Sequence, residues 1–317
     1  MGLNASGIAS DPSIWHASDG YRLWFTSVQL AGSDAILETA VATSSDGLAF
    51  AAPTDPVLQP SGSGWDSAGV ETVSVLRDAT GMFRLWYAGD LPPPGSNQYA
   101  IGAASSADGI HWTKIAAPVL SPEAAWEQPV CVDPPACTEH FGGVLEPSVI
   151  EDANGFTMWY AALGEQDSVV TYRIGRARSS DGVTWTHDPA PVLLPGAAGS
   201  FDDALVSHVD VVADPGGGYH MFYFGSSQAD AAACTAAGGC AMTPGAIGHA
   251  FSSDGIAWTR DAAPVLVPRA GELDAWTLGG PSALIEDGEM RVYYFGNATS
   301  STFAAGFARA RASCEQQ

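Results

Sequence analysis

The heptapeptide Ser179-Ser180-Asp181-Gly182-Val183-Thr184-Trp185 is one copy of a pattern that recurs along the chain. The same pattern, with Phe in place of Trp in the first copy, occupies residues 44–50, 106–112 and 252–258. Each copy is followed at a similar offset by Pro-Val-Leu, at residues 56–58, 118–120, 191–193 and 264–266. Regular recurrence at this spacing indicates that the chain repeats one supersecondary unit.

Each unit has the composition of four strands. In the third unit, residues 147–150 are an apolar inner strand, residues 157–160 an aromatic strand and residues 174–177 a strand of small residues. The fourth strand begins at Trp185 and ends at Pro-Val-Leu. Aromatic and β-branched residues favour packed strands, and Asp-Gly is typical of hairpin turns because Gly tolerates a positive φ.

A fifth unit begins at residues 280–282 but lacks the Ser-x-Asp-Gly turn and a fourth strand. We therefore predict an all-β fold, a five-bladed β-propeller with four-stranded antiparallel blades around a central channel. The predicted blades form a single domain over residues 1–317 and cover approximately residues 11–60, 61–122, 123–197, 198–269 and 270–313. We also expect the segment around residues 3–10 to supply the missing outer strand of the last blade.

The repeated Ser-x-Asp-Gly-x-x-Trp pattern is predicted to be structural. Four copies cannot all be catalytic, whereas an Asp that caps a turn and a Trp that packs between blades are useful in every unit.

The charge of the chain excludes several classes of partner. Lys and Arg number 12 and Asp and Glu 35, so the formal net charge is −23. Such a surface repels phosphate backbones and anionic lipids. We expect no nucleic acid and no membrane as partner, and a monomer.

Four of the five cysteines form two equally spaced pairs, Cys131 with Cys137 and Cys234 with Cys240. Neither pair completes a Cys-x-x-Cys zinc pattern, so disulfides are favoured over metal. Cys314 has no evident role. Disulfides form in oxidising compartments. We therefore expect a secreted or periplasmic protein, and because no signal peptide or transmembrane run is visible, we expect that an export signal has been removed.

Candidate site residues follow from the predicted topology. In an antiparallel meander, the long connections at residues 91–99, 121–143 and 226–246 emerge at the end of the propeller opposite the Ser-x-Asp-Gly turns. Long loops often carry function, and the inner strands begin at this same end, around the mouth of the channel. Aligned on the Pro-Ser position, their first residues are Asp11, Glu71, Glu146, His208 and Gly280. Carboxylates crowded near an axis raise one another's pKa, which allows a general acid and a general base to coexist.

The five-unit pattern, Asp11-Pro12-Ser13 at the first inner strand and the Ser-x-Asp-Gly-x-x-Trp…Pro-Val-Leu repeat resemble the five-bladed hydrolases of glycoside hydrolase families 43, 32 and their relatives. The resemblance covers essentially the whole chain. In family 43 an Asp in blade one is the general base, an acid in blade three tunes pKa values and a Glu in blade four is the general acid. The resemblance implies that Asp11 is the base and Glu146 the modulator, as Glu in place of the usual Asp. Blade four departs from the family pattern because His208 stands where the acid is expected.

Three assignments stay open. His208 is itself the acid, as in a related propeller family that acts on anhydrogalactose and uses a histidine. Alternatively, Glu146 or Glu71 is the acid and His208 orients the substrate. In the third assignment the site binds sugar without hydrolysing it. An inverting mechanism requires the acid and the base to lie about 6.5–9.5 Å apart.

Four further residues are candidates for substrate contacts. Asp210 shares a strand face with His208, and Trp15, His16 and His140 each occur once near the predicted mouth. Aromatic residues that recur before the inner strands are predicted to be mainly structural; they are Trp65, Trp126, Phe201 and Trp276. We predict no metal ligands and no cofactor, with Ca²⁺ in the axial channel left open.

The predicted function is hydrolysis of a glycosidic bond in an extracellular poly- or oligosaccharide, with inversion and with Asp11 activating water. The alternatives are a non-catalytic carbohydrate-binding propeller, that is, a degenerate glycosidase, and a propeller used only as a scaffold. A phosphorylase like those of the related family 130 is disfavoured, because no Arg or Lys cluster lies near the inner-strand starts to hold phosphate.

Overall fold

The computed structural model describes residues 9–31, 34–51, 55–92, 97–236, 239–240, 242–299 and 307–312. This part of the chain is nearly all β, as predicted. Its helices are the 3-10 turn η1 (Ala125–Glu127) and the nine-residue α1 (Gln228–Ala236). No helix within the described ranges has the length and apolarity needed to cross a membrane.

The described strands fall into five groups that pair antiparallel, which we call units 1 to 5. Unit 1 contains β1 (Ala9–Ala17), β2 (Gly20–Ala31) and β3 (Asp34–Ser44). Unit 2 contains β4 (Gly69–Arg77), β5 (Phe83–Leu91), β6 (Gln98–Ser106) and β7 (Thr113–Lys114). Unit 3 contains β8 (Val130–Cys131), β9 (His140–Asp152), β10 (Gly155–Gln166), β11 (Val169–Ser179) and β12 (Thr186–His187). Unit 4 contains β13 (Leu205–Ala213), β14 (Tyr219–Ser226), β15 (Ala246–Ser252) and β16 (Thr259–Arg260), and unit 5 contains β17 (Thr277–Glu286), β18 (Glu289–Asn297) and β19 (Phe307–Ala312).

Parallel pairing links the first three units into one 12-stranded sheet. The links are short: Leu37 pairs with Gly69 between units 1 and 2, and Gln98 and Tyr99 pair with Gly142 and Gly143 between units 2 and 3. Because only one or two residue pairs cross each boundary, the units stay distinct within the continuous sheet.

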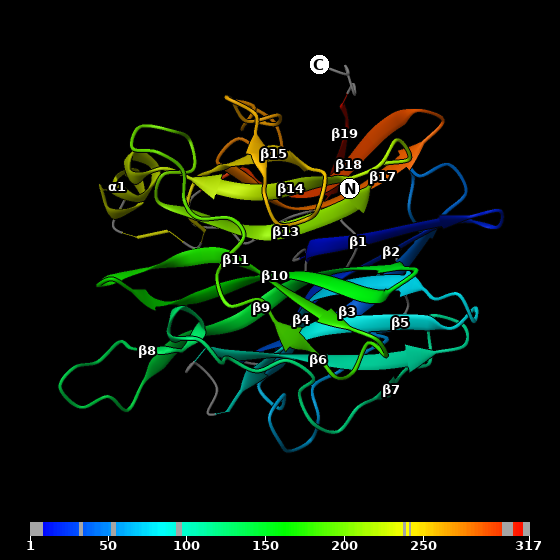
Figure 1. Cartoon of the computed structure of the whole chain (residues 1–317), viewed down its shortest axis with the longest axis horizontal. Helices are drawn as coiled ribbons and strands as arrows, with labels where there is room; N and C mark the ends of the chain where they lie inside the picture. The colour runs from blue at the N-terminus through cyan, green and yellow to red at the C-terminus, as the bar shows by residue number, and fades with distance from the viewer. Residues whose placement is uncertain are drawn as a thin grey trace.

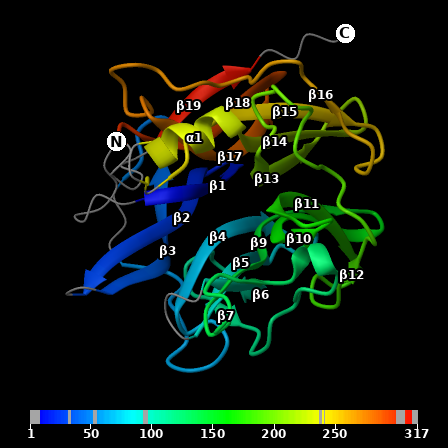
Figure 2. The same cartoon turned by 90° about the vertical axis from the view of Figure 1, so that its left-hand side faces the viewer.

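The long first strands of the units, β1, β4, β9, β13 and β17, contact one another in that order, and β17 also contacts β1. Figure 1 accordingly shows the last unit beside the first. Figure 2 shows these five strands near the centre of the molecule, with β7, β12 and β16 toward its periphery. The apolar cores lie between facing sheets, where buried aromatic residues of the second strands, such as Trp86 and Trp159, fill the space.

A ring of hydrogen bonds joins the inner strands. One side-chain oxygen in each inner strand accepts a hydrogen bond from a backbone N–H of the next unit, at 2.7–3.1 Å. The acceptor and donor pairs are Ser13 with Val75, Ser74 with Val149, Ser148 with Val211, Asp210 with Ala283 and Ser282 with Ile14. The last contact returns to unit 1, so the ring is closed.

Replacing Ser148 with Ala is expected to destabilise the protein by about 1–3 kcal/mol, because the buried N–H of Val211 then loses its acceptor. The midpoint of urea unfolding should fall at an unchanged m-value. Ser180→Ala changes an exposed Ser in the turn after β11, so it is the matched control and should shift the midpoint little. Equal midpoints for the two variants would contradict a stabilising ring.

The Ser-x-Asp-Gly turns are structural, as predicted. In unit 3, Asp181 Oδ1 accepts hydrogen bonds from the Ser179 hydroxyl and from the N–H groups of Val183 and Thr184, and the other three turns repeat this arrangement. The Trp at the end of each full pattern packs edge-on against a Trp of the preceding unit, as Trp185 does against Trp86.

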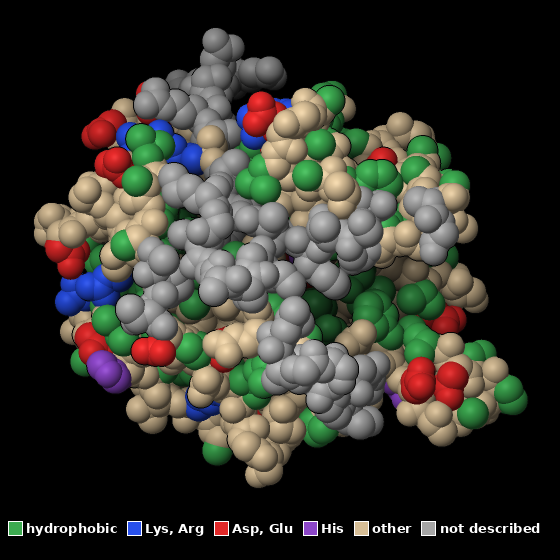
Figure 3. All heavy atoms as spheres, turned by 180° about the vertical axis from the view of Figure 1, so that it is seen from behind, with side chains coloured by type: hydrophobic (Ala, Val, Ile, Leu, Met, Phe, Trp, Pro, Cys, Tyr) green, Lys and Arg blue, Asp and Glu red, His purple; other side chains and the backbone are tan. Residues whose placement is uncertain are grey.

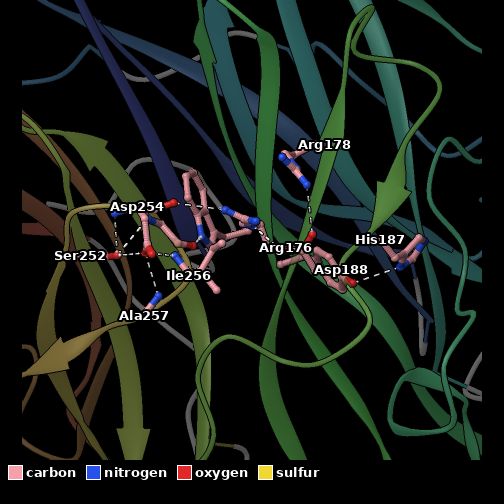
Figure 4. A network of polar contacts seen from close by, with 11 residues as sticks. Arg176, Arg178, His187, Asp188, Ser252, Asp254, Ile256 and Ala257 are labelled. Atoms are coloured by element: carbon pink, nitrogen blue, oxygen red, sulfur yellow. Dashed lines mark hydrogen bonds and ion pairs between the residues drawn. The ribbon is translucent and has the colours of Figure 1, made fainter.

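The same turns also tie the units together. Trp86 Nε1–H donates to the carbonyl oxygen of Gly182 in the next unit, and Trp24 and Trp159 do the same for Gly109 and Gly255. Figure 4 shows a second contact between units, in which Arg176 of unit 3 donates hydrogen bonds to Asp188 and to the carbonyl oxygen of Asp254 in unit 4. The turns therefore link neighbouring units at the end opposite the long loops.

Several details differ from the predicted units. The fourth strand is only two residues long in units 2, 3 and 4, with one more bridge at the Leu of Pro-Val-Leu, as between Ile174 and Leu193. The predicted loop at residues 226–246 contains α1, a helix that no apolar periodicity in the sequence predicts. Within the expected closing strand at residues 3–10, only Ala9 and Ser10 are described, and they belong to β1. Cys314 also lies outside the described residues.

Both predicted disulfides are present, Cys131–Cys137 and Cys234–Cys240. They lie in the β7–β9 and β14–β15 connections, at the same end of the molecule as the starts of the inner strands. Figure 2 views this end and shows α1 in front of the sheets.

Candidate active site

Every inner strand has a β-bulge at the same point, marked by a register shift against its neighbour. The residue at each bulge has a positive φ of 45–55°; the five residues are Asp11, Thr72, Glu146, His208 and Gly280. A left-handed conformation costs a non-Gly residue about 1–3 kcal/mol, and such residues cluster at functional sites. All five line one small cavity on the axis.

The structure corrects the predicted alignment in unit 2. Thr72, not Glu71, occupies the bulge, and Glu71 lies one residue earlier, paired with Ala88. Unit 2 has no Pro-Ser pair to mark the register; its anchor is Ser74, which occupies the ring position of Ser13 and Ser148. A one-residue offset reverses the face on which a strand residue lies. Glu71 therefore does not line the cavity.

His208 connects the two carboxylates at the bulges. Its Nε2 lies 3.2 Å from Asp11 Oδ1, and its Nδ1 lies 3.4 Å from Glu146 Oε1. The backbone N–H of His208 also donates to Glu146 Oε2, and the Ser10 hydroxyl donates to Asp11 Oδ2. Units 1, 3 and 4 thus contribute one acid–imidazole–acid arrangement to the axis.

The electrostatics of this arrangement favour a charged imidazole. Burial opposes charge on His208, but the carboxylates of Glu146, Asp11 and Glu71 outweigh it and raise the pKa of His208 to about 9. Burial also raises the pKa of Glu146, and the nearby His208 only partly offsets that rise. At neutral pH His208 is therefore protonated, and Glu146 holds its proton to a higher pH than an ordinary Glu.

The surroundings of His208 hold the ring in place. Its side chain is 19% exposed and packs edge-on between Phe224 and Phe295, with ring centroids 5.8 and 5.9 Å away. Gly280 lies beside Asp11 and Phe295, where there is no room for a larger side chain. A Cβ at Gly280 would lie 3.0 Å from the Asp11 Cα and 2.8 Å from Phe295 Cδ1. Neither phenylalanine was identified from sequence, although both occupy the same position in the second strands of their units.

Asp210 is at the axis but has a different environment from the one predicted. Its Oδ2 accepts the N–H of Ala283 at 2.7 Å in the inter-unit ring, and Oδ1 lies 3.4 Å from the Ser148 hydroxyl. Burial raises the pKa of Asp210 to about 7. Both oxygens are engaged within the protein, so Asp210 takes the position that Ser holds in the other units.

The prediction that Trp15 and His16 lie near the mouth is wrong. β1 runs away from the mouth after Asp11, and at roughly 3.3 Å per residue these side chains lie at the turn end. Trp15 packs on Phe83, and His16 stacks on Tyr21 and pairs with Glu286. His140 starts β9 at the correct end, opposite Cys131, but it does not line the cavity.

The recurring aromatic residues before the inner strands are packing residues, as predicted. Trp65, Trp126 and Phe201 each stack on a tyrosine of the second strand in the same unit. The acid that follows each of them accepts a hydrogen bond from that tyrosine, as Asp66 does from Tyr87.

Sequence reasoning missed a group of residues on the face of unit 2 that packs against unit 3. By register, Glu71, Asp90 and Tyr99 share this face, because Asp90 pairs with Tyr99 and Glu71 with Ala88. Burial and the charges of Asp11, Asp90 and Glu146 raise the pKa of Glu71 to about 8. Burial raises the pKa of Asp90 to about 6. Among the described residues, no three His, Cys, Asp or Glu side chains are arranged to hold a metal ion.

Comparison with known proteins supports the architecture. No family model matches the chain. It is 28% identical over 154 residues to the uncharacterized protein Rv1502 of Mycobacterium tuberculosis (strain ATCC 25618 / H37Rv), which covers 48% of this chain and 44% of that protein. The match thus spans less than half the length of this curated relative.

Solved structures match almost the whole chain. A structure described as a glycoside hydrolase has a TM-score of 0.75 at 20% identity and covers 96% of this chain and 87% of its own. A thermostable family-43 glycoside hydrolase has a TM-score of 0.70 at 15% identity, with 97% and 90% covered. The chain therefore shares its fold with glycoside hydrolases, and the resemblance found in the sequence is confirmed at the level of the fold.

Proposed function

We propose that this protein is a glycoside hydrolase that cleaves an extracellular poly- or oligosaccharide with inversion. The carrying observation is the Asp11–His208–Glu146 arrangement, in which two carboxylates contact opposite nitrogens of one imidazole at the mouth of the axis. We further propose that the five units are the blades of a closed five-bladed propeller forming a single domain. The closed ring of inner-strand hydrogen bonds supports this reading.

In this proposal Asp11 is the general base. Its carboxylate lies beside the protonated His208 and can accept a proton from the attacking water. The Ser10 hydroxyl holds the other oxygen of Asp11 and so orients the group.

Glu146 is the proposed general acid. Its raised pKa favours the protonated form that donates to the leaving oxygen. The two acids contact different nitrogens of one ring, so the imidazole lies between them, and an inverting mechanism requires them to be about 6.5–9.5 Å apart to admit water. His208 is then a positioning residue that separates the acids and balances their charge.

The two disulfides support a secreted or periplasmic location, since such bonds persist in oxidising compartments. Hydrolysis is favoured over phosphorolysis because the described lining of the cavity contains no Lys or Arg for a phosphate.

Screening the purified protein against aryl glycosides and against plant and algal polysaccharides tests the proposal. For any substrate that is cleaved, proton NMR of the first-formed product should show the anomer opposite to that of the substrate. Retention of configuration would contradict the assignment of Asp11 as a base that activates water. Sugar binding without turnover on any substrate would instead favour the carbohydrate-binding alternative.

A further inference from the structure

The group on the unit 2 face defines a second polar surface beside the proposed catalytic residues. Glu71, Asp90 and Tyr99 lie on the face whose Ala88 packs with Leu145 and Trp159 of unit 3. Glu71 is close enough to Asp11, Glu146 and His208 for their charges to shift its pKa. The surface therefore borders the mouth on its unit 2 side.

Two oxygens on this side have no protein partner. Asp90 is 6% exposed, and its Oδ1 is buried without a hydrogen bond. Thr72 is 8% exposed and lines the cavity, and its Oγ1 is also buried without a hydrogen bond. A buried acceptor without a donor costs about 1–3 kcal/mol, so native proteins retain few of them. Here the two unsatisfied atoms belong to neighbouring strands of the unit that borders the mouth.

The missing donor does not come from a described basic side chain. Of the 12 Lys and Arg residues, all but Arg311 have a described side chain, and none of these 11 lines the cavity. The basic residues with an acidic partner are paired elsewhere: Arg22 with Asp19, Arg84 with Asp78, Lys114 with Asp66, Arg176 and Arg178 with Asp188, Arg260 with Asp202, Arg269 with Asp274, and Arg291 with Glu286 and Glu289. Arg77 and Arg173 bond to backbone carbonyls of their own hairpins, and Arg309 and Arg311 lie on β19.

Acidic groups consequently outnumber cations at the mouth. The charges of Asp11, Glu146 and Glu71 act on the His208 imidazole, which Asp11 and Glu146 already share, and Asp90 acts on Glu71. The surface of the molecule shows the same imbalance: acidic side chains are spread over the face in Figure 3, and basic ones are fewer. A positively charged group from a ligand is the complement that this side of the mouth lacks.

We propose that Glu71 and Asp90 form a subsite for the protonated amine of an amino sugar, next to the Asp11–His208–Glu146 arrangement. An ammonium group supplies three donors and a positive charge, which matches the unsatisfied Asp90 Oδ1 and the excess of acidic over basic side chains at the mouth. A uronate, sulfate or phosphate group would meet like charges in the same place. The inference rests on the proposed function, since it assigns the substrate class of that site.

Because its pKa is raised, Glu71 is mostly protonated at neutral pH in the free protein, and a cationic ligand would change that. Burial raises the pKa of Asp90 to about 6 and contributes most to the rise of the pKa of Glu71 to about 8. A bound ammonium group would favour the ionised form of both, as an opposite charge does at short range.

Binding of three matched sugar pairs tests the proposal. Glucosamine, galactosamine and mannosamine are each compared with glucose, galactose and mannose by calorimetric titration of the intact protein. At least one amino sugar should bind about ten-fold more tightly than its parent, the usual gain from a charge-assisted hydrogen bond. Asp90→Asn should reduce that preference to about two-fold or less. The control Asp19→Asn changes an exposed acid at the opposite end and should retain the preference.

Three results would overturn the subsite. They are equal affinity within every pair, a preference that survives Asp90→Asn, and absence of binding by all six sugars at about 100 mM. Thermal unfolding shows whether Asp90→Asn is folded; because the change removes an unpaired buried charge, its Tm should not fall.

The outcomes separate this inference from the proposed hydrolase. An amine preference in a protein that cleaves no glycoside would retain the subsite and remove the hydrolase. Cleavage of neutral glycosides without an amine preference would do the reverse.

Discussion

Asp11→Asn should lower kcat/KM by about 10²–10⁴-fold, the usual contribution of a general base, and leave sugar affinity within a few fold. The amide is nearly isosteric with the carboxylate, so the bulge and the contact from Ser10 can persist. It cannot accept the proton of the attacking water. The loss should therefore appear in kcat and much less in KM, as expected for an interaction made only in the transition state.

The measurement is steady-state hydrolysis of the best substrate from the screen, together with calorimetric titration of its sugar product. Asp19→Asn is again the matched control, because it removes one carboxylate far from the axis and should keep wild-type turnover. An Asp11→Asn variant with more than about a tenth of wild-type turnover would exclude Asp11 as the base. A variant that loses sugar affinity and turnover equally would point to a binding role.

Most of the fold was predictable because the repeat encodes local structure directly. The Ser-x-Asp-Gly turns are satisfied by hydrogen bonds within four or five residues, so their conformation depends little on the remainder of the chain. The aromatic second strands were predictable for a similar reason, since they alternate and pack in every unit. The closed ring of inner-strand contacts was not predictable, because the donor and the acceptor of each bond lie more than 60 residues apart.

The alignment of the site was most secure where a local marker set the register, although His208 was placed correctly without one. Pro-Ser follows Asp11 and Glu146, and both lie at the bulge as the alignment required. In unit 2 the marker is absent, and the alignment was wrong by one residue at Glu71. Successive side chains of a strand point to opposite faces, so an error of one residue selects the wrong face. Thr72, and not Glu71, lines the cavity.

Other differences follow from strand direction and from pairing across strands. Trp15 and His16 are near Asp11 in sequence, but an extended strand carries them to the far end of the unit. Asp90 and Tyr99 are separated from Glu71 by about 20–30 residues, and only the register of three strands brings them to one face. Spacing along the chain contains no signal for that coincidence.

Replacement of Glu146 by Gln should separate substrates by their leaving groups. Hydrolysis of glycosides with poor leaving groups, such as alkyl or sugar alcohols, should fall by about 10²–10⁴-fold, because the departing oxygen loses its proton donor. Dinitrophenyl glycosides leave without protonation, and their hydrolysis should fall by much less. The isosteric amide can still accept the backbone N–H of His208, so the loss reports on the proton and not on the backbone contact.

The pH dependence gives an independent test of the same assignment. Since burial raises the pKa of Glu146, the wild-type enzyme should remain active to higher pH than an ordinary Glu would allow and should lose kcat/KM as pH rises through that raised pKa. In Glu146→Gln this basic limb should disappear for dinitrophenyl substrates, because the titrating group is gone. Glu71→Gln is the matched comparison, since Glu71 also has a raised pKa but does not line the cavity. The opposite result is that Glu71→Gln, and not Glu146→Gln, shows the leaving-group dependence and loses the basic limb of the pH profile. In that case the proton donor is Glu71, and Glu146 only modulates the pKa of the groups around it.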